Sequence, residues 1–483
     1  ETPTRLFRIS FWIATKDKKM VQGVVIEAGK IIDRSPATGE VVAEVAASSA
    51  DDVIAAVAAA RAAQPQWAST PLADRIAALK SAVKAFGQEN GVEALAALMQ
   101  REMGKIRSEA VEEVEGAVDK DEFLDLIEEA NRPLRLGHNA TVVRDPHGVV
   151  GVNAPWNFPM DEILLLALPA LAAGNAVVVK PSEVAPLCGA KVVEALAKSL
   201  PVPGVAQLVQ GDGAVGAQLV DLVDMVALTG SSAVGKKVME KASASLKPLV
   251  LELGGKDPMV VLESADLDVA AKDAVTYSVM NCGQVCCAVE RVYVPSALLA
   301  TFEAKVVDVA SKHQDLAPLV SKMQQKIVAE HVASAIDAGA RCLVGGPEAA
   351  ATLDSEKPAG SSFYPLTVLT DVPHDAKITR DETFGPVVAI TPYSPADDVV
   401  ALANDTAYGL SACVYGARDE AAVVASRIRA GQVGVNAWPL AVAPPQCPWV
   451  GHKASGFGYH SGADGWRQFS VPKSIVINDD SSA

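Results

Sequence analysis

Apolar positions recur with helical spacing over residues 46–132, and Ser49 and Thr70 stand where two of these helices would begin. From residue 161 the pattern changes, because short apolar runs alternate with helical stretches. The runs expected as strands are residues 176–179, 205–209, 225–228 and 248–251, and helices are expected from Asp161, Pro186 and Ser232. Repeated β-α-β units of this length predict a parallel, doubly wound sheet.

A second alternating block covers residues 259–436 and predicts a second α/β domain. Its expected helices are residues 266–280, 297–311, 320–338 and one from residue 396, with strands at 291–294 and near residues 367 and 387. Residues 140–153 predict two short strands around the turn Asp145-Pro146-His147-Gly148, and residues 471–478 predict a further strand.

Composition and charge exclude several classes of protein. The 483 residues include 42 basic and 58 acidic ones, and the resulting net charge of −16 would repel nucleic acid and anionic lipid. The longest apolar run, residues 163–179, is shorter than a bilayer span and is broken by Pro169, so no membrane segment is predicted. Seven scattered cysteines, an odd number, give no disulfide framework and leave at least one thiol free.

Residues 1–24 form an N-terminal extension of uncertain status. They are basic, which fits either the remnant of a processed targeting peptide or a vector-derived scar, so they are left out of the fold prediction. The expected location is a soluble, reducing compartment. This would be the cytoplasm or, after removal of a targeting peptide, an organelle matrix or stroma.

Two glycine patterns mark places where phosphate could approach backbone amides. Residues 211–216 have the spacing G-x-G-x-x-G, with Gly213 in the middle, and either a dinucleotide site or a plain tight turn would explain them. Residues 230–236 have the spacing of a nucleotide-hydrolase loop, but Lys237 stands where Ser or Thr should bind magnesium. A hydrolase is therefore disfavoured, while the helix start remains a good anion site.

The segment Asn281-Cys282-Gly283-Gln284-Val285-Cys286-Cys287 lies between an expected helix and an expected strand. A thiol in such a loop can be reached by substrate and activated by nearby dipoles. An intracellular cysteine taken alone is more often a small buried hydrophobe, so the remaining motifs decide between the two interpretations.

Six motifs together resemble the aldehyde dehydrogenase superfamily, in its NAD(P)-dependent, hydrolytic branch. They occur in the family's order, and the similarity covers nearly all of residues 25–480. The motifs are Pro155-Trp156-Asn157-Phe158-Pro159, Lys180-Pro181-Ser182-Glu183, Thr229-Gly230-Ser231 through Gly235, Glu252-Leu253-Gly254-Gly255-Lys256, Asn281 to Cys286, and Glu382-Thr383-Phe384-Gly385-Pro386.

This resemblance implies the α/β aldehyde dehydrogenase fold. The fold has a Rossmann-like, doubly wound cofactor domain, a second α/β catalytic domain and a small β oligomerisation extension. The expected dinucleotide-binding domain is residues 25–139 and 154–253, the catalytic domain 254–448, and the extension 140–153 with 466–483. Because the family's extension pairs with a neighbouring subunit, a homodimer or homotetramer is expected.

The resemblance also implies oxidation of an aldehyde to a carboxylic acid with NAD(P)+. Cys286 resembles the nucleophile, and the Asn157 amide and the Cys286 backbone N–H resemble the donors that hold the oxyanion. Glu252 resembles the base that activates water to hydrolyse the thioester. Two alternatives stay open. One is a CoA-acylating enzyme, which Glu252 disfavours, and the other is a catalytically silent structural homologue.

The expected cofactor contacts follow from the same resemblance, and no metal is expected. Lys180 and Glu183 would hold the adenosine ribose. Since Glu183 would accept from a ribose 2′-OH and repel a 2′-phosphate, NAD is preferred, although Lys180 could still accommodate the phosphate of NADP. The other expected contacts are Ser231 at the pyrophosphate, Glu382 at the nicotinamide-side ribose, Phe384 beside the ring, and Trp156, Ser182, Gly213, Thr229, Gly230, Gly235 and Leu253.

Some positions depart from the family pattern. His460 stands where many members carry a glutamate thought to relay protons, and a histidine there could do the same or be merely structural. Asp161 and Glu162 could form an acidic mouth that favours cationic aldehydes, or they could simply offset the dipole of a helix start. Residues 438–449, WPLAVAPPQCPW, predict a rigid apolar wall at the substrate and leave the aldehyde open.

Overall fold

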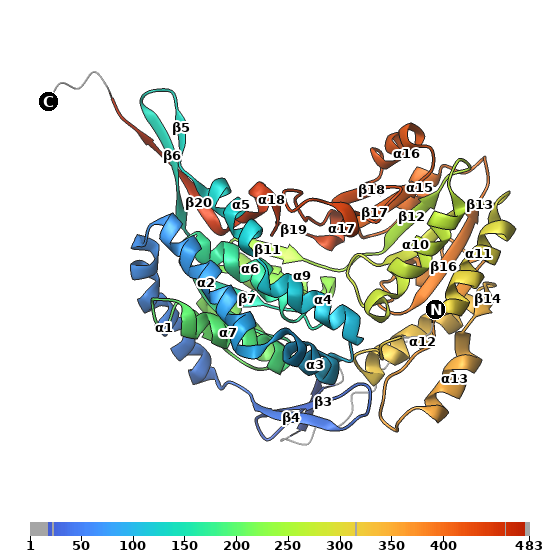
Figure 1. Ribbon diagram of the computed structural model, residues 1–483, viewed down its shortest axis with the longest axis horizontal. Helices are drawn as coiled ribbons and strands as arrows, with labels where there is room; N and C mark the ends of the chain where they lie inside the picture. The colour runs from blue at the N-terminus through green and yellow to red at the C-terminus, as the bar shows by residue number, and fades with distance from the viewer. Residues whose placement is uncertain (1–17, 22–23, 314–315, 459, 479–483) are drawn as a thin grey trace, which may run out of the picture.

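The chain folds into two halves, each built on one sheet, with a thin arm projecting from the first half (Figure 1). A computed structural model describes residues 18–21, 24–313, 316–458 and 460–478. The predicted N-terminal extension therefore lies outside the described residues except for residues 18–21 and residue 24. No helix in the described ranges is long and apolar enough to cross a membrane.

The sheet of the first half has six strands in the order β19-β11-β10-β7-β8-β9. All neighbours run parallel except β19, which is antiparallel to β11. The central strands are continuous apolar runs because both of their faces are covered by other parts of the chain. The strands are β7 (Val149–Asn153), β8 (Ala176–Lys180), β9 (Ala206–Leu208), β10 (Met225–Thr229), β11 (Leu249–Glu252) and β19 (Gly456–Phe457).

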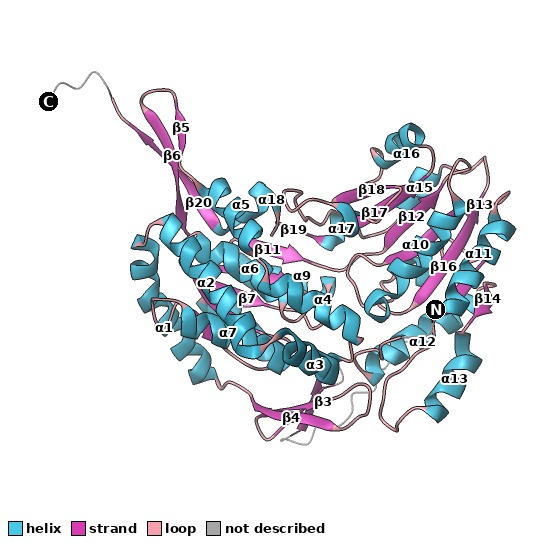
Figure 2. Ribbon diagram, viewed as in Figure 1, coloured by secondary structure: helices cyan, strands magenta, loops and turns pink. Residues whose placement is uncertain are grey.

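Helices cover this sheet (Figure 2). Ser49 caps the first helix as predicted, because its hydroxyl accepts from the Asp52 amide at 3.2 Å while the Asp52 carboxylate accepts from the Ser49 amide at 2.8 Å. The prediction for Thr70 was wrong, since Pro71 is the N-cap of the second helix. The helices are α1 (Ala50–Ser69), α2 (Leu72–Asn90), α3 (Val92–Met103), α4 (Arg107–Val118), α5 (Asp121–Asn131), α6 (Asp161–Ala172), α7 (Pro186–Ser199), α8 (Gly213–Leu222), α9 (Ser232–Ser243) and α18 (Gly462–Trp466).

The second half is built on a seven-stranded sheet in the order β14-β15-β16-β13-β12-β17-β18, in which only β14 pairs antiparallel. The strands are β12 (Asp257–Val261), β13 (Val289–Pro295), β14 (Arg341–Val344), β15 (Thr367–Thr370), β16 (Val387–Tyr393), β17 (Ser411–Tyr415) and β18 (Gln432–Val435). The helices are α10 (Leu267–Val279), α11 (Leu299–Lys312), α12 (Lys322–Asp337), α13 (Gly346–Glu356), α14 (Lys377–Arg380), α15 (Val399–Asn404), α16 (Arg418–Ala425) and α17 (Pro439–Val442). The predicted second α/β unit is confirmed.

Two small antiparallel sheets complete the fold. One, absent from the prediction, consists of β1 (Lys18–Val21), β2 (Val24–Glu27), β3 (Lys30–Arg34) and β4 (Val41–Ala46). The other forms the arm and consists of β5 (Leu134–Leu136), β6 (Ala140–Pro146) and β20 (Ser470–Val476).

The predicted extent of the extension, residues 140–153, was wrong at both ends. Residues 149–153 form β7, which pairs with β8 and β10 inside the six-stranded sheet, and all five of its residues are buried. Residues 134–136, expected in the dinucleotide-binding domain, instead pair with β6 in the arm. The remaining domain limits stay predictions.

A buried ion pair fixes the start of α6. Lys105 Nζ and Glu113 Oε2 lie 2.5 Å apart, and both side chains are 1% exposed. The other oxygen of Glu113 accepts from the backbone N–H groups of Met160 and Asp161, at 3.1 and 3.4 Å. Glu113 therefore neutralises a buried cation and also binds free amides at a helix N-terminus.

Replacing Glu113 by alanine should lower the free energy of unfolding by about 3–5 kcal/mol, because Lys105 would then be a buried charge without a partner. The exposed pair of Lys312 and Asp308, at 2.6 Å, provides the control: Asp308→Ala should leave the denaturation midpoint nearly unchanged. Urea unfolding of both variants checks this. Equal losses of stability would contradict the assignment.

Candidate functional site

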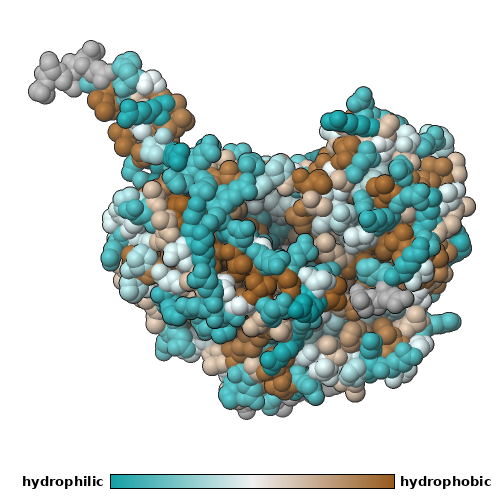
Figure 3. All heavy atoms as spheres, viewed as in Figure 1, coloured by the Kyte–Doolittle hydropathy of each residue, from teal (hydrophilic) through white to brown (hydrophobic). Residues whose placement is uncertain are grey.

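A cleft of about 770 Å³ lies where the strands of the first sheet end and face the second half. Its lining includes the last residues of β7, β8, β10 and β11, which are Asn153, Lys180, Thr229 and Glu252. The carboxyl edge of a doubly wound sheet is the usual position for a ligand. The molecular surface is indented between the two halves (Figure 3).

The cleft brings together residues that lie far apart in the sequence. The predicted catalytic residues Cys286, Glu252 and Asn157 all line it. The predicted cofactor residues that line it are Trp156, Lys180, Ser182, Glu183, Gly213, Thr229, Gly230, Ser231, Leu253, Glu382 and Phe384.

Gly235 is not among the residues that line the cleft. A β carbon at Gly235 would lie 2.6 Å from Leu253 Cδ1, so this glycine allows α9 to pack closely against Leu253. Its effect on the cleft is indirect, through the position of Leu253.

The loop that carries Cys286 has an unusual backbone. Three successive residues, Asn281, Cys282 and Gly283, have positive φ angles of 49°, 58° and 72°. A β carbon at Gly283 would lie 2.1 Å from the carbonyl oxygen of Gly385, so only glycine fits there. Two non-glycine residues in the left-handed region cost free energy that surrounding contacts must offset.

Hydrogen bonds hold this loop against Asn157. Asn157 Nδ2 donates to the Gln284 carbonyl at 3.0 Å, and Asn281 Nδ2 donates to the Asn157 carbonyl at 3.1 Å. The Asn281 backbone N–H donates to Glu109 Oε1 at 2.9 Å, and Gln284 Oε1 accepts from the Val320 N–H at 2.7 Å. The Asn157 side-chain amide has two N–H bonds. One donates to the Gln284 carbonyl, and the other is available to donate to a ligand.

The thiol of Cys286 is protonated at neutral pH in the free protein. Its pKa is raised well above the usual value, first by the hydrogen bond with the Cys287 side chain, then by burial and by the charge of Glu252. The thiol thus lies within the electrostatic reach of the carboxylate predicted to act as the base.

Glu252, the last residue of β11, is buried, and burial raises its pKa. Trp449 Nε1 donates to Glu252 Oε1 at 3.0 Å, which favours the ionised form, whereas Glu252 Oε2 has no hydrogen-bond partner. A carboxyl group with a raised pKa and a free oxygen suits proton abstraction from water.

The acidic residues at the start of α6 do not form an open acidic mouth. Asp161 is ion-paired with Lys120 at 2.5 Å, and Glu162 Oε2 accepts from Thr229 Oγ1 at 3.0 Å. Neither lines the cleft. Burial, with Glu252 and Asp161 nearby, raises the pKa of Glu162 well above its usual value.

His460 is buried, and burial lowers its pKa to about 4, so it is neutral at pH 7. Its Nδ1 lies 3.1 Å from Ser461 Oγ, whereas Nε2 has no partner. One donor atom of each of Glu162, Glu252 and His460 lies within 4.8 Å of the other two.

The part of the cleft predicted to take the adenosine end carries both a charge pair and a helix start. Lys180 Nζ lies 3.2 Å from Glu183 Oε2 and donates to the Gly211 carbonyl at 2.8 Å. Ser231 caps α9 with its side chain, and Gly213 begins α8. Free amides at such starts attract anions.

At the other end of the cleft, Glu382 Oε1 accepts from the Gly255 N–H at 3.1 Å, and burial raises the pKa of Glu382 to about 8. Phe384 packs edge-on against Trp156, with ring centroids 5.5 Å apart. The backbone N–H of Phe384 donates to Glu290 Oε1 at 2.8 Å, and Glu290 is ion-paired with the buried Lys256.

Two tryptophans that bond to groups of the predicted catalytic site were not predicted from the sequence. Besides Trp449, Trp438 Nε1 donates to the Cys287 carbonyl at 2.9 Å, and its ring stacks on Tyr277 with centroids 4.5 Å apart. Both tryptophans belong to the segment predicted as an apolar wall. The presence of two indoles in one short loop was the available signal, because buried indole N–H groups need acceptors.

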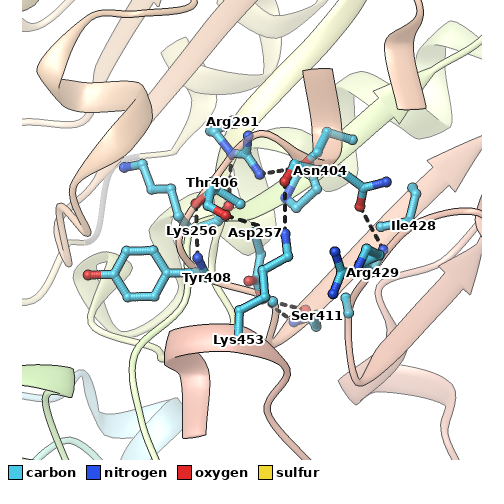
Figure 4. A pocket seen from close by; sticks show the side chains of 14 residues that line it. Lys256, Asp257, Arg291, Asn404, Thr406, Tyr408, Ser411, Ile428, Arg429 and Lys453 are labelled. Carbon is cyan, nitrogen blue, oxygen red and sulfur yellow. Dashed lines mark hydrogen bonds between the residues drawn. The ribbon is translucent and has the colours of Figure 1, made fainter. Parts of the chain in front are cut away.

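A second cavity, of about 10 Å³, lies in the second half (Figure 4). Its polar side chains bond to nearby protein atoms: Lys453 Nζ donates to the Asn404 carbonyl at 2.8 Å, and Arg291 Nε donates to the Lys256 carbonyl at 2.8 Å. A space of this size holds about one water. It is therefore too small for a substrate.

Comparisons with known proteins agree with this geometry. The aldehyde dehydrogenase family matches residues 26–475. A Mycolicibacterium smegmatis protein named "Putative succinate-semialdehyde dehydrogenase (NADP+)" is 37% identical over 465 residues, which cover 91% of this chain and 87% of that protein.

Two solved structures illustrate the structural similarity. Aldehyde dehydrogenase C from Pseudomonas syringae, solved as a mutant with NAD+ and octanal, is 33% identical with a TM-score of 0.85 and covers 95% of this chain and 96% of its own. Lactaldehyde dehydrogenase from Escherichia coli is 29% identical with a TM-score of 0.83 and covers 93% of this chain and 95% of its own.

Alkylation of Cys286 by iodoacetamide should accelerate about tenfold for each pH unit between 7 and 9, because its pKa lies well above that range. Cys287→Ala removes the hydrogen bond that raises this pKa most, so the variant should label faster at pH 7.5. Peptide mass spectrometry measures both rates. Cys188→Ala, a buried cysteine in the other half, should change nothing, and equal rates in all three proteins would contradict the assignment.

Proposed function

Because the chain belongs to the aldehyde dehydrogenase family, we propose that it oxidises an aldehyde to the carboxylic acid with NAD(P)+ as the hydride acceptor. The observation that carries the proposal is the single cleft lined by Cys286, Glu252 and Asn157 together with the predicted cofactor residues. A thiol, a base and an amide donor in one concave site are the parts that covalent aldehyde oxidation needs.

Cys286 loses its proton to solvent, and its thiolate Sγ forms a bond to the aldehyde carbon. The carbonyl oxygen becomes an oxyanion. The second N–H of the Asn157 amide and the Cys286 backbone N–H donate to it. The bond from Asn157 to the Gln284 carbonyl holds the amide in place before substrate arrives.

A nicotinamide held in this cleft would supply the hydride acceptor, and loss of hydride from the tetrahedral carbon would leave a thioester on Cys286. Glu252 then deprotonates the water that cleaves this thioester, so the products are the acid and the free thiol. Burial supports this role because it raises the pKa of Glu252 towards the working pH. The Trp449 hydrogen bond keeps one oxygen fixed and leaves the other for water.

The cleft fits a dinucleotide in both size and chemistry. Its volume of about 770 Å³ lies in the usual range for ligand pockets. Ser231 and the start of α9 would hold the phosphates, and Glu183 would hold the adenosine ribose. Because Lys180 pairs with Glu183, it partly offsets the repulsion of a 2′-phosphate. We therefore propose NAD with NADP as an accepted alternative, as the name of the M. smegmatis relative suggests.

Two other functions are less well supported. Transfer of the acyl group to coenzyme A would not need Glu252 as a buried base beside the thiol. A silent homologue would not need Cys286, Glu252 and Asn157 to face one cleft. Product analysis with and without coenzyme A distinguishes the three functions. Hydrolysis gives the free acid in both cases, acyl transfer gives a coenzyme A thioester, and a silent homologue gives neither product.

We also propose that the arm pairs with a second copy of the chain. Its strands carry exposed apolar side chains, and an exposed apolar patch is typical of an interface. They are Leu134 (58% exposed), Leu136 (50%), Val471 (48%), Ile475 (47%) and Val476 (67%).

The seven free cysteines support a location in a reducing compartment.

Glu252→Gln should keep a first-turnover burst of NADH while lowering the steady-state rate by about 100-fold or more, because the thioester forms but is not hydrolysed. Cys286→Ala should abolish both phases. Stopped-flow absorbance at 340 nm measures them, with a series of aldehydes as substrates. Glu240→Gln, an exposed carboxylate on α9, is the control. A full steady-state rate in Glu252→Gln would contradict the mechanism.

Ile475→Asp should lower the molar mass of the protein in solution to that of a smaller assembly, because it places a charge on the apolar surface of the arm. Light scattering after size-exclusion chromatography measures the mass. Leu246→Asp, at an exposed position after α9 (90% exposed), should have no effect. An unchanged mass in Ile475→Asp would exclude the arm as the interface.

A further inference from the structure

Three side chains, of which two are buried and one is partly buried, meet at Glu252 in the wall of the cleft. Glu162 lies in the first turn of α6, Glu252 ends β11, and His460 follows β19. One donor atom of each lies within 4.8 Å of the other two, so a single ion could contact all three after small side-chain movements. The set comes from three distant parts of the sequence and is assembled only by the folded chain.

Two atoms of this cluster are buried without a hydrogen-bond partner. They are Glu252 Oε2 and His460 Nε2, and each side chain is 3% exposed. Buried polar atoms in proteins are almost always bonded, so two orphan atoms in one cluster mark a position where a ligand would bind. The orphan atoms are a carboxylate oxygen and an imidazole nitrogen, both common metal donors.

Each of the three side chains is also held by a hydrogen bond. Thr229 Oγ1 donates to Glu162 Oε2 at 3.0 Å, and Trp449 Nε1 donates to Glu252 Oε1 at 3.0 Å. Ser461 Oγ lies 3.1 Å from His460 Nδ1, the nitrogen opposite the orphan Nε2. Outer hydrogen bonds of this kind orient the ligands of metal sites.

The charge of the cluster matches a divalent cation. Among the described residues, no lysine or arginine forms an ion pair with Glu162 or Glu252. The neighbouring carboxylates of Asp161 and Glu113 are already neutralised by Lys120 and Lys105. The two unpaired carboxylates and a neutral imidazole would therefore form an electrically neutral site with one doubly charged ion.

We propose that Glu162, Glu252 and His460 bind a divalent transition-metal ion of the zinc class, and that this ion reversibly inhibits the enzyme. Two carboxylates and one imidazole are ligands that zinc accepts, at about 2.0–2.2 Å. Binding releases the protons held by the carboxyl groups to solvent, and no group changes its oxidation state. The bound ion holds Glu252 as a ligand, so Glu252 no longer deprotonates water. Only this inhibition rests on the function proposed above.

The test measures ZnCl₂ binding by isothermal titration calorimetry in a Cys286→Ala background, so that the reactive thiol cannot act as a ligand. Glu162→Gln and His460→Asn should each weaken one binding event by about tenfold or more. Glu240→Gln, an exposed carboxylate on α9, and His452→Asn, an exposed histidine, are the matched controls and should retain it. Proton release, measured by titration in buffers of different ionisation enthalpy, should accompany this event alone.

Unchanged zinc affinity in Glu162→Gln and His460→Asn would overturn the site, and so would a binding event that disappears in the Cys286→Ala background. In the parent protein, zinc should slow the steady-state rate more than the NADH burst, and a chelator should restore the rate. The burst in Glu252→Gln without zinc tests the proposed function separately. If zinc binds as expected but Glu252→Gln does not change turnover, the proposed function is refuted while the zinc-binding site is still supported.

Discussion

The hydrogen bond from the Asn157 amide to the Gln284 carbonyl joins the two halves of the molecule at the point where chemistry takes place. Asn157 follows β7 in the first sheet, whereas Gln284 lies in the loop after α10 in the second half. The return bond from Asn281 to the Asn157 carbonyl makes the contact reciprocal. These bonds help to hold a left-handed loop, which would be costly alone, against the first sheet, so that the thiol lies at the cleft.

The buried carboxylates of this structure differ in whether a cation lies beside them. Three buried carboxylates have a cation beside them: Glu113 has Lys105, Glu290 has Lys256, and Glu183 has Lys180. Glu252 has no such partner among the described residues, and the Trp449 indole N–H donates to it instead. A lysine beside Glu252 would lower its pKa and make it a weaker base, so the lack of a cation there serves the proposed chemistry.

Local patterns predicted much of the fold, whereas a family resemblance supplied the candidate site residues. The helices over residues 46–132, the buried strands β8 and β10 and the start of α7 at Pro186 all follow from spacing and capping signals. Cys286, Glu252 and Asn157 came from a resemblance, and the structure places them in one cleft. The turn between β6 and β7 was predicted, but the assignment of both strands to one extension was wrong, because pairing partners decide which sheet each strand joins.

Contacts between distant segments could not be predicted in the same way. Trp449 and Glu252 are 197 positions apart, and nothing local in either segment indicates the bond between them. The same holds for His460 beside Glu162, since histidine and glutamate were interpreted separately as a relay and as a helix-start charge. β19 pairs antiparallel with β11, so that Gly456 lies opposite Glu252, and His460 follows four residues later. Glu252, whose pKa burial raises, thus lies among side chains of the kind that bind metals, and only the folded chain brings them together.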